Sequence, residues 1–213
     1  MRPLDPAIER FMQGRVARRS SAALPERSDH VSPGNPFIPT EDPTMARIQP
    51  IPLDALPAPL ADAVARGGAN RMLSSTVPVQ VWAHRPELAQ AWLATLETMH
   101  VNGVLDGRLR ELVRLRIASI TTCKACQLAR KDDAVSEEDI ACLSTDDARF
   151  SPHEKAALRY AELFAADYMA IDDAVFAELG RHFSTAQIVE LNMFCALMLA
   201  GGRMTYVQQA YAE

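Results

Sequence analysis

The chain has little of what marks several classes of protein. Aromatic residues make up only 6% of its 213 residues and nine are glycine, while alanine, leucine and methionine are plentiful, a composition that favours helices. Basic charge is also scarce. The formal net charge of −5 argues against a general nucleic-acid binder, which would be strongly basic.

Apolar segments that would address the chain to a membrane are lacking as well. We find no apolar run of the roughly 18 residues that a bilayer span requires. The N-terminus lacks the apolar core of a secretory signal. We therefore expect a cytoplasmic protein with neither a membrane nor a nucleic acid among its partners. Four cysteines in such a chain indicate thiol chemistry rather than a disulfide scaffold.

Proline divides the sequence into two parts. Residues 1–52 hold nine of the 14 prolines and no sustained apolar pattern. Pro33–Pro39 excludes a helix there, whereas residues 5–18 are compatible with a short one. Two interpretations stay open: a flexible tail, or upstream extension of a protein that starts at Met45, and an arm that lies on a neighbouring subunit. Residues 53–213 have room for one domain with a substantial core.

Helical periodicity and capping signals recur through this second part. Helix starts are marked by Ser136, by Ser151 followed by proline, and by Ser184 with Gln187 three residues on. The last helix is apolar nearly all round, which indicates a central or oligomer-buried position. The sequence predicts an all-α fold, with helices over residues 53–65, 85–100, 106–122 and 172–183, a cysteine-bearing helix, helices after the three serines, and a loop over 70–78.

Cys123 and Cys126 have the spacing at which two thiols can close a disulfide across one helical turn. We expect Thr121 or Thr122 to cap a helix that carries them in its first turn, where free N–H groups stabilise a thiolate. An inert pair and half of a zinc site are the alternatives. Zinc requires two further ligands that no second motif supplies, so we expect no metal and no cofactor. Cys142 and Cys195 are expected to be core thiols.

The surroundings of the pair resemble a known family. Eleven residues separate Glu111 from Cys123, and further similar segments cover residues 84–92, 136–140, 151–163 and 183–191. Together they resemble the AhpD-like branch of the carboxymuconolactone decarboxylase superfamily. The resemblance implies an all-α fold, a homo-oligomer (trimer or hexamer), and a thiol-dependent peroxidase or disulfide reductase that a lipoyl or thioredoxin-type donor regenerates.

The resemblance also implies roles for single residues. It places Glu111 beside the second cysteine and makes Cys126 the peroxidatic thiol, which we expect to be less accessible than Cys123. Peroxidase members carry a relay histidine four residues after the second cysteine, where this chain has Arg130. Arginine cannot shuttle protons near neutral pH. We expect Arg130 to pair with Glu111, favouring a Cys126 thiolate while slowing peroxide turnover.

Two classes of function follow from these expectations. The first is an oxidoreductase in which Cys123, Cys126, Glu111 and Arg130 act on a peroxide or a small disulfide. The second is a non-redox lyase of the decarboxylase type, or a non-catalytic binding protein on the same scaffold. Decarboxylase members of the superfamily use a base histidine, which this chain does not obviously supply. Titration of free thiols before and after addition of peroxide distinguishes the two classes.

Overall fold

The structure is a computed structural model that describes residues 46–143 and 147–211, apart from the side chains of Lys124 and Ala125. The predictions about the short helix over 5–18, the tail or arm, and Met45 lie outside these residues. Every regular element in the described part is a helix and no strand occurs among them, so the predicted all-α fold is confirmed.

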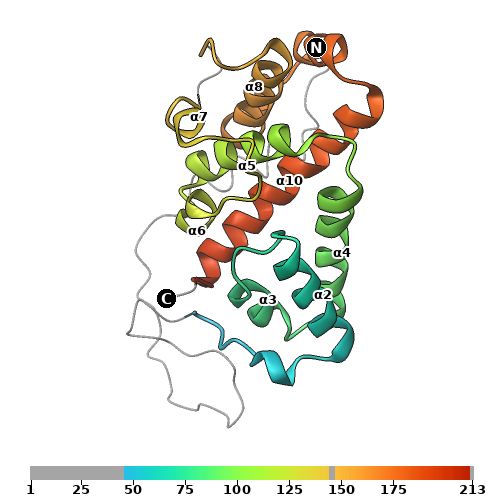
Figure 1. Cartoon of the computed structure of the whole chain (residues 1–213), viewed down its shortest axis with the longest axis vertical. Helices are drawn as coiled ribbons and strands as arrows, with labels where there is room; N and C mark the ends of the chain where they lie inside the picture. Colours follow the sequence, from blue (N-terminus) through green and yellow to red (C-terminus); the bar gives the residue numbers. More distant parts are fainter. Residues whose placement is uncertain (1–45, 144–146, 212–213) are drawn as a thin grey trace, which may run out of the picture. The chain divides into compact units, whose positions relative to one another are not determined.

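The described helices follow one another closely along the chain (Figure 1). In order they are η1 (Leu53–Ala55), α2 (Ala58–Ala69), α3 (Val77–Trp82), α4 (Pro86–Asn102), α5 (Gly107–Thr121), α6 (Lys124–Leu128), α7 (Glu137–Ala141), α8 (Pro152–Ala166), η2 (Tyr168–Ala170), α9 (Asp173–His182) and α10 (Thr185–Gln208).

Two predicted boundaries near the start of the domain are wrong. The helix expected over residues 53–65 is instead η1 followed by α2, which begins only after Pro57 because proline is accepted in the first turn but not inside a helix. The loop expected to extend to Pro78 ends earlier. Pro78 lies in the first turn of α3, where its missing N–H is not needed.

The predicted helix starts after the three serines are confirmed. Ser136, Ser151 and Ser184 each form a capping box with the residue three positions on. In each box the two side chains satisfy backbone N–H groups that a helix start leaves free. Local sequence therefore determines where α7, α8 and α10 begin.

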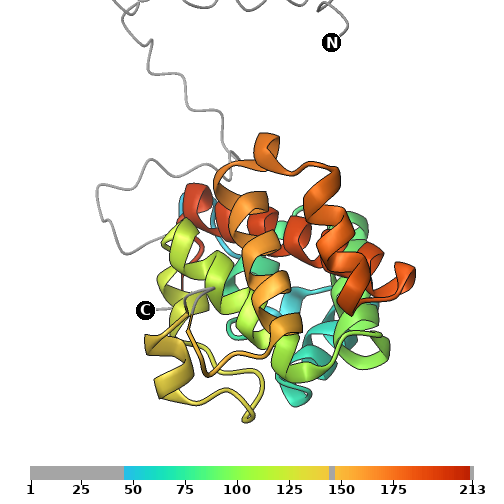
Figure 2. The same ribbon diagram turned by 90° about the horizontal axis from the view of Figure 1, so that it is seen from above.

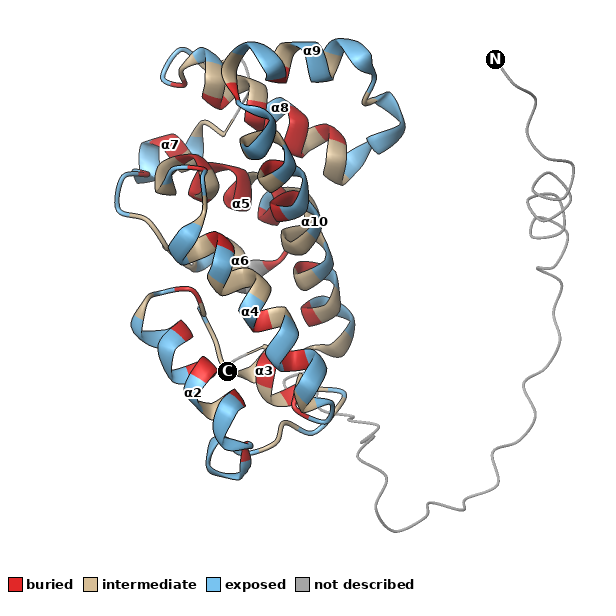
Figure 3. Cartoon of the chain, turned by 90° about the vertical axis from the view of Figure 1, so that its right-hand side faces the viewer, coloured by how far each residue is buried: buried red, intermediate tan, exposed pale blue. Residues whose placement is uncertain are grey.

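Helix α5 is buried on two sides, as its red and tan colouring in Figure 3 shows. Leu109, Val113 and Ile117 pack in one apolar cluster with residues of α8, α9 and α10. Leu112 and Leu115 pack in another, with Val135, Phe150 and Leu158. A helix enclosed in this way has few contacts with water, so any charged side chain on it needs a partner inside the protein.

Helix α10 extends past α5 and α8 and reaches the segment that carries the cysteines (Figure 2). A Cβ atom added at Gly202 would lie 3.8 Å from the Cβ atom of Cys123. By length and composition alone α10 is apolar enough to cross a membrane. Here it packs against α4, α5, α8 and α9, and it leaves Val189 and Met193 about half exposed.

Candidate active site

The chain turns sharply between α5 and α6, and this turn positions the first cysteine. Thr122 ends α5 in the left-handed conformation, with φ of 54°. The Cys123 carbonyl then accepts the Gln127 N–H at 2.9 Å, the first bond of α6. The Thr121 hydroxyl donates to the carbonyl of Ile117, and the Thr122 hydroxyl donates to the carbonyl of Thr121. The prediction that one of these threonines caps the cysteine helix is therefore wrong. Cys123 itself occupies the cap position.

The sulfur of Cys123 therefore faces the free end of α6. It accepts hydrogen bonds from the Cys126 thiol and from the Cys126 backbone N–H. These bonds, together with the positive charge of Arg114, outweigh burial and lower the pKa of Cys123 from 9.0 to about 6. The pKa of Cys126 is raised, because its proton is held in the bond to Cys123 and because it is desolvated.

The two cysteines thus differ from the sequence-based expectation in both accessibility and charge. Cys123 is 1% exposed, whereas Cys126 is partly exposed. We expected the reverse order, on the assumption that a residue nearer the helix start is nearer to solvent. Gly202 of α10 covers Cys123 closely, which the local sequence did not reveal. The hydrogen bonding that lowers the pKa of Cys123 and raises that of Cys126 favours the thiolate on Cys123.

Beneath the cysteine segment lies a buried ion pair on α5. Arg114 donates two hydrogen bonds of 2.7 Å to the two carboxylate oxygens of Glu111, and both side chains are at most 5% exposed. A pair this deep is stable only if further bonds satisfy its remaining polar atoms. The backbone of the next segment supplies them.

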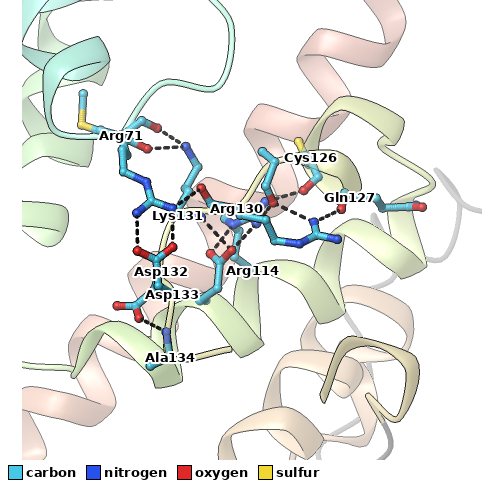
Figure 4. Close-up of polar contacts among 12 residues, drawn as sticks. Arg71, Arg114, Cys126, Gln127, Arg130, Lys131, Asp132, Asp133 and Ala134 are labelled. Carbon is cyan, nitrogen blue, oxygen red and sulfur yellow. Dashed lines mark hydrogen bonds and ion pairs between the residues drawn. The ribbon is translucent and has the colours of Figure 1, made fainter. Parts of the chain in front are cut away.

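Arg114 and Glu111 together hold the chain that follows Cys126 (Figure 4). Arg114 donates to the carbonyls of Cys126 and Ala129, the latter at 2.7 Å. The Lys131 backbone N–H donates to Glu111 at 3.0 Å. The ion pair therefore fixes α6 and the turn after it relative to α5.

Arg130 does not make the ion pair with Glu111 that we expected. It forms a two-pronged pair with Glu137 at 2.7 and 2.9 Å, and the side chain of Glu137 is 72% exposed. The expectation placed Arg130 on the same helix as Cys126, but α6 ends at Leu128. Arg114, which lies three residues after Glu111 on one helix face, takes the place we gave to Arg130.

Lys131 is a further, half-buried cation beside the cysteines, and the sequence pattern gave it no specific role. Its Nζ donates to the carbonyl oxygens of Arg71, at 3.0 Å, and Met72, both in the turn after α2. Burial, followed by the charge of Arg114, lowers the pKa of Lys131 to about 8. The sequence signal was weak, since a lysine beside an arginine after a short helix is usually solvated.

Both cysteines line an apolar cavity of about 150 Å³. A cavity of this size can hold a molecule as large as benzene when its walls are apolar. The wall comes from elements on both sides of the cysteines, namely the segment from Met72 to Trp82, α4, α5, α10 and the C-terminal turn. Its members include Met72, Leu73, Val79, Trp82, Trp92, Leu96, Arg114, Ile117, Lys131, Leu197, Met198 and Tyr211.

The other two cysteines lie away from this cavity. Cys195 is fully buried in α10, where desolvation raises the pKa of its thiol, as expected of a core residue. Cys142 is partly exposed, so its assignment to the core is wrong. All four cysteines are free thiols. Within residues 46–143 and 147–211, no group of three or more histidine, cysteine, aspartate or glutamate side chains could hold a metal ion.

The cysteine segment and the helices beside it match a known family. Residues 86–163 match the model of the carboxymuconolactone decarboxylase family. This segment is of that family, and the fold around it is AhpD-like. The resemblance found in the sequence is thereby confirmed. No relative among curated proteins matches the chain by sequence.

Solved structures share the fold at low sequence identity. An alkylhydroperoxidase AhpD core from Ralstonia eutropha JMP134, an uncharacterized peroxidase-related protein, is 20% identical with a TM-score of 0.63, over 79% of this chain and 92% of that one. The debrominase Bmp8 is 18% identical with a TM-score of 0.66, over 77% and 90%. A cysteine-to-alanine variant of Bmp8 in complex with 2,3,4-tribromopyrrole is 16% identical, with a TM-score of 0.57 over 64% and 76%.

Proposed function

We propose that the protein is a thiol oxidoreductase in which Cys123 and Cys126 cycle between dithiol and disulfide while reducing a small peroxide. The observation that carries the proposal is that both cysteines line one apolar cavity, where hydrogen bonding from Cys126 and the charge of Arg114 lower the pKa of Cys123. A thiolate is the form that attacks a peroxide oxygen. A second thiol in bonding contact resolves the resulting sulfenic acid to a disulfide.

The remaining predicted site residues take different roles in this proposal. Glu111 acts through Arg114, which it holds beside the cysteines, and is therefore a positioning residue. Arg130 has no part in the chemistry, because its guanidinium is paired with Glu137. The cavity wall favours an organic hydroperoxide, since an apolar substituent is accommodated there without loss of hydrogen bonds.

Thiol titration tests this function directly. One equivalent of tert-butyl hydroperoxide is expected to consume two thiols per chain and to lower the mass by the two hydrogens lost on disulfide formation. Cys123→Ser and Cys126→Ser variants are expected to lose this stoichiometry, while Cys195→Ser retains it. An unchanged thiol count in the wild type contradicts the proposal and favours the lyase or binding alternative.

A second candidate function is reductive dehalogenation of a small aromatic compound. It is supported by the fold shared with a debrominase and by Trp82 and Trp92, which line the cavity with ring centroids 5.8 Å apart. An aryl bromide and two thiols would give the dehalogenated arene, a disulfide, a proton and bromide. Bromide release from a brominated pyrrole, without comparable loss of hydroperoxide, would favour this function over the first.

The regenerating partner and the assembly follow from the proposed function. We propose a lipoyl or thioredoxin-type dithiol as donor, because a disulfide in a reducing cytoplasm is returned to dithiol by exchange. Dihydrolipoamide or reduced thioredoxin should then restore the two thiols. A homo-oligomer would cover the half-exposed apolar residues of α10, Val189 and Met193. Light scattering at micromolar concentration measures the assembly.

A further inference from the structure

Reduction of a hydroperoxide inside this cavity requires a source of protons. When a thiolate attacks the outer peroxide oxygen, the O–O bond breaks and the inner oxygen leaves as an alkoxide. An unprotonated alkoxide is strongly basic, and its charge is costly to leave in apolar surroundings. A group that donates a proton to it must therefore lie at the cavity wall.

Few groups that line the cavity can serve. Among the described residues that line it there is no histidine, aspartate or glutamate. A guanidinium does not act as a proton donor near neutral pH, and that of Arg114 is bound to Glu111. Burial raises the pKa of Tyr211, which makes it a poorer acid. The two cysteines are themselves reactants. The serine and threonine hydroxyls of the wall are weaker acids than an ammonium group, which leaves Lys131 as the candidate proton donor.

The position of Lys131 suits it to this task. Hydrogen bonds to the Arg71 and Met72 carbonyls fix its ammonium and use two of three N–H groups, which leaves one for a ligand (Figure 4). The side chain lines the cavity together with Cys126. A neighbouring cavity of about 60 Å³, which Glu111 lines, also borders on Lys131.

The charges that face Lys131 come from three elements. From α5, Arg114 disfavours its cationic form and Glu111 favours it; from α6, Cys126 favours it; and Arg71, in the turn after α2, disfavours it. Burial is the largest influence, and the result is a pKa of about 8. A lysine with this pKa is mostly protonated at neutral pH and gives up its proton far more readily than a solvated one.

We propose that Lys131 is the general acid of this site, donating a proton to the oxygen that leaves the peroxide and then accepting the proton of Cys126. The inference rests on the proposed thiol chemistry and adds to it a residue that neither the sequence pattern nor the comparisons indicate. The structural alternative is that Lys131 serves only to fix the turn at Arg71 and Met72.

The proton balance closes over two steps. In the first, the Cys123 thiolate takes the outer oxygen to become a sulfenic acid, and Lys131 protonates the alkoxide to an alcohol. In the second, neutral Lys131 takes the proton of Cys126, whose thiolate attacks the sulfenic sulfur. The hydroxide displaced takes the same proton from Lys131 and leaves as water. The peroxide is reduced, the dithiol is oxidised, and Lys131 recovers a proton from solvent.

A comparison of two reactions of the same thiols tests the role of Lys131. Oxidation by tert-butyl hydroperoxide needs a proton for the leaving oxygen, whereas alkylation by iodoacetamide expels iodide and needs none. Lys131→Arg keeps the positive charge and can keep the carbonyl bonds but does not donate a proton near neutral pH. We expect single-turnover oxidation to slow by about 100-fold with alkylation little changed. Lys155→Arg, on α8 away from the cavity, is the matched control.

The possible results distinguish the acid role of Lys131 from the proposed thiol function. Oxidation and alkylation that fall together in Lys131→Arg, or an oxidation rate that does not fall, overturn the acid role. The wild type supplies a second test should the variant not fold: hydroperoxide oxidation is expected to decline above pH 8, as Lys131 loses its proton, while alkylation does not. A flat oxidation profile from pH 7 to 9 overturns the inference. A wild type that hydroperoxide does not oxidise at all overturns the proposed function itself.

Discussion

Arg108 and Arg114 on helix α5 both bind carboxylates, and their surroundings differ. Arg108 donates to Asp139 and Glu154, each at 2.7 Å, and its side chain is 29% exposed. Arg114 binds only Glu111 among carboxylates, and its side chain is 5% exposed. The contacts of Arg108 lie at an edge of the domain, while the Arg114–Glu111 pair lies beneath the cysteines.

The carboxylates bound by Arg108 have other bonding partners, whereas the one bound by Arg114 depends mainly on that arginine. Asp139 and Glu154 are members of capping boxes, so they remain bonded to the starts of α7 and α8 without Arg108. Glu111 has no comparable role besides its bonds to Arg114 and to the Lys131 N–H. Of the two arginines, only Arg114 contributes to the lowered pKa of Cys123. The Arg108 cluster joins helix ends, whereas the Arg114 pair joins the scaffold to the proposed chemistry.

The strongest test of this comparison is Arg114→Met. It strands a buried carboxylate, which costs about 3–5 kcal/mol of the free energy of unfolding. It also removes the cation that helps to lower the pKa of Cys123, so this pKa is expected to rise. Urea unfolding measures the first effect, and the pH dependence of iodoacetamide alkylation measures the second.

The double variant Glu111→Leu with Arg114→Met separates the two effects. Removing both charges is expected to recover most of the stability, because an apolar pair of similar volume needs no bonding partners. The pKa of Cys123 is expected to stay raised. A single Arg114→Met variant as stable as the wild type would show that the pair is not truly buried in solution.

Arg108→Met is expected to have a smaller effect on stability and none on the thiols. Losing charged hydrogen bonds at a part-exposed site costs about 1.5–3 kcal/mol. The cysteines lie outside the reach of this cluster, so the alkylation profile should match that of the wild type. A shifted profile would mean that the Arg108 and Arg114 sites on α5 are coupled.

The sequence predicted features that depend on local residues and missed those that depend on contacts between distant segments. Helix starts were predictable because capping boxes are local, as at Ser151 and Ser184. Glu111 was found by resemblance. The role of Arg130 was mistaken because the cysteine helix was taken to continue past Leu128. Lys131 and the cavity depend on contacts between distant segments, and no local pattern reports those.

The pair of sulfurs itself offers a third test. In Cys126→Ala the thiol that donates to Cys123 is absent, so the pKa of Cys123 should rise from about 6 toward its ordinary value of 9.0. The rise is expected to be partial, since the backbone N–H and Arg114 remain. Cys126→Ser keeps a donor and should shift the pKa less. Alkylation rates of the single remaining site thiol, followed from pH 5 to 10, should rise through the thiol pKa in each variant. Identical profiles in both variants would rule out the thiol bond as the cause.

The smallest effect is expected for Arg130→Ala, which marks where the site ends. Its partner Glu137 is 72% exposed, and an ion pair so open to water is weakened by solvent and by salt. Arg130 does not contribute to the lowered pKa of Cys123, unlike Arg114. The alkylation profile, the thiol count after hydroperoxide and the urea midpoint should therefore all match the wild type. Arg114→Met, measured in parallel, gives the alkylation profile expected when a cation that influences the thiol pKa is lost. If Arg130→Ala slowed alkylation at neutral pH as Arg114→Met is expected to, Arg130 would belong to the site, and the Arg130–Glu137 pair could not be treated as separate from the buried Arg114–Glu111 pair.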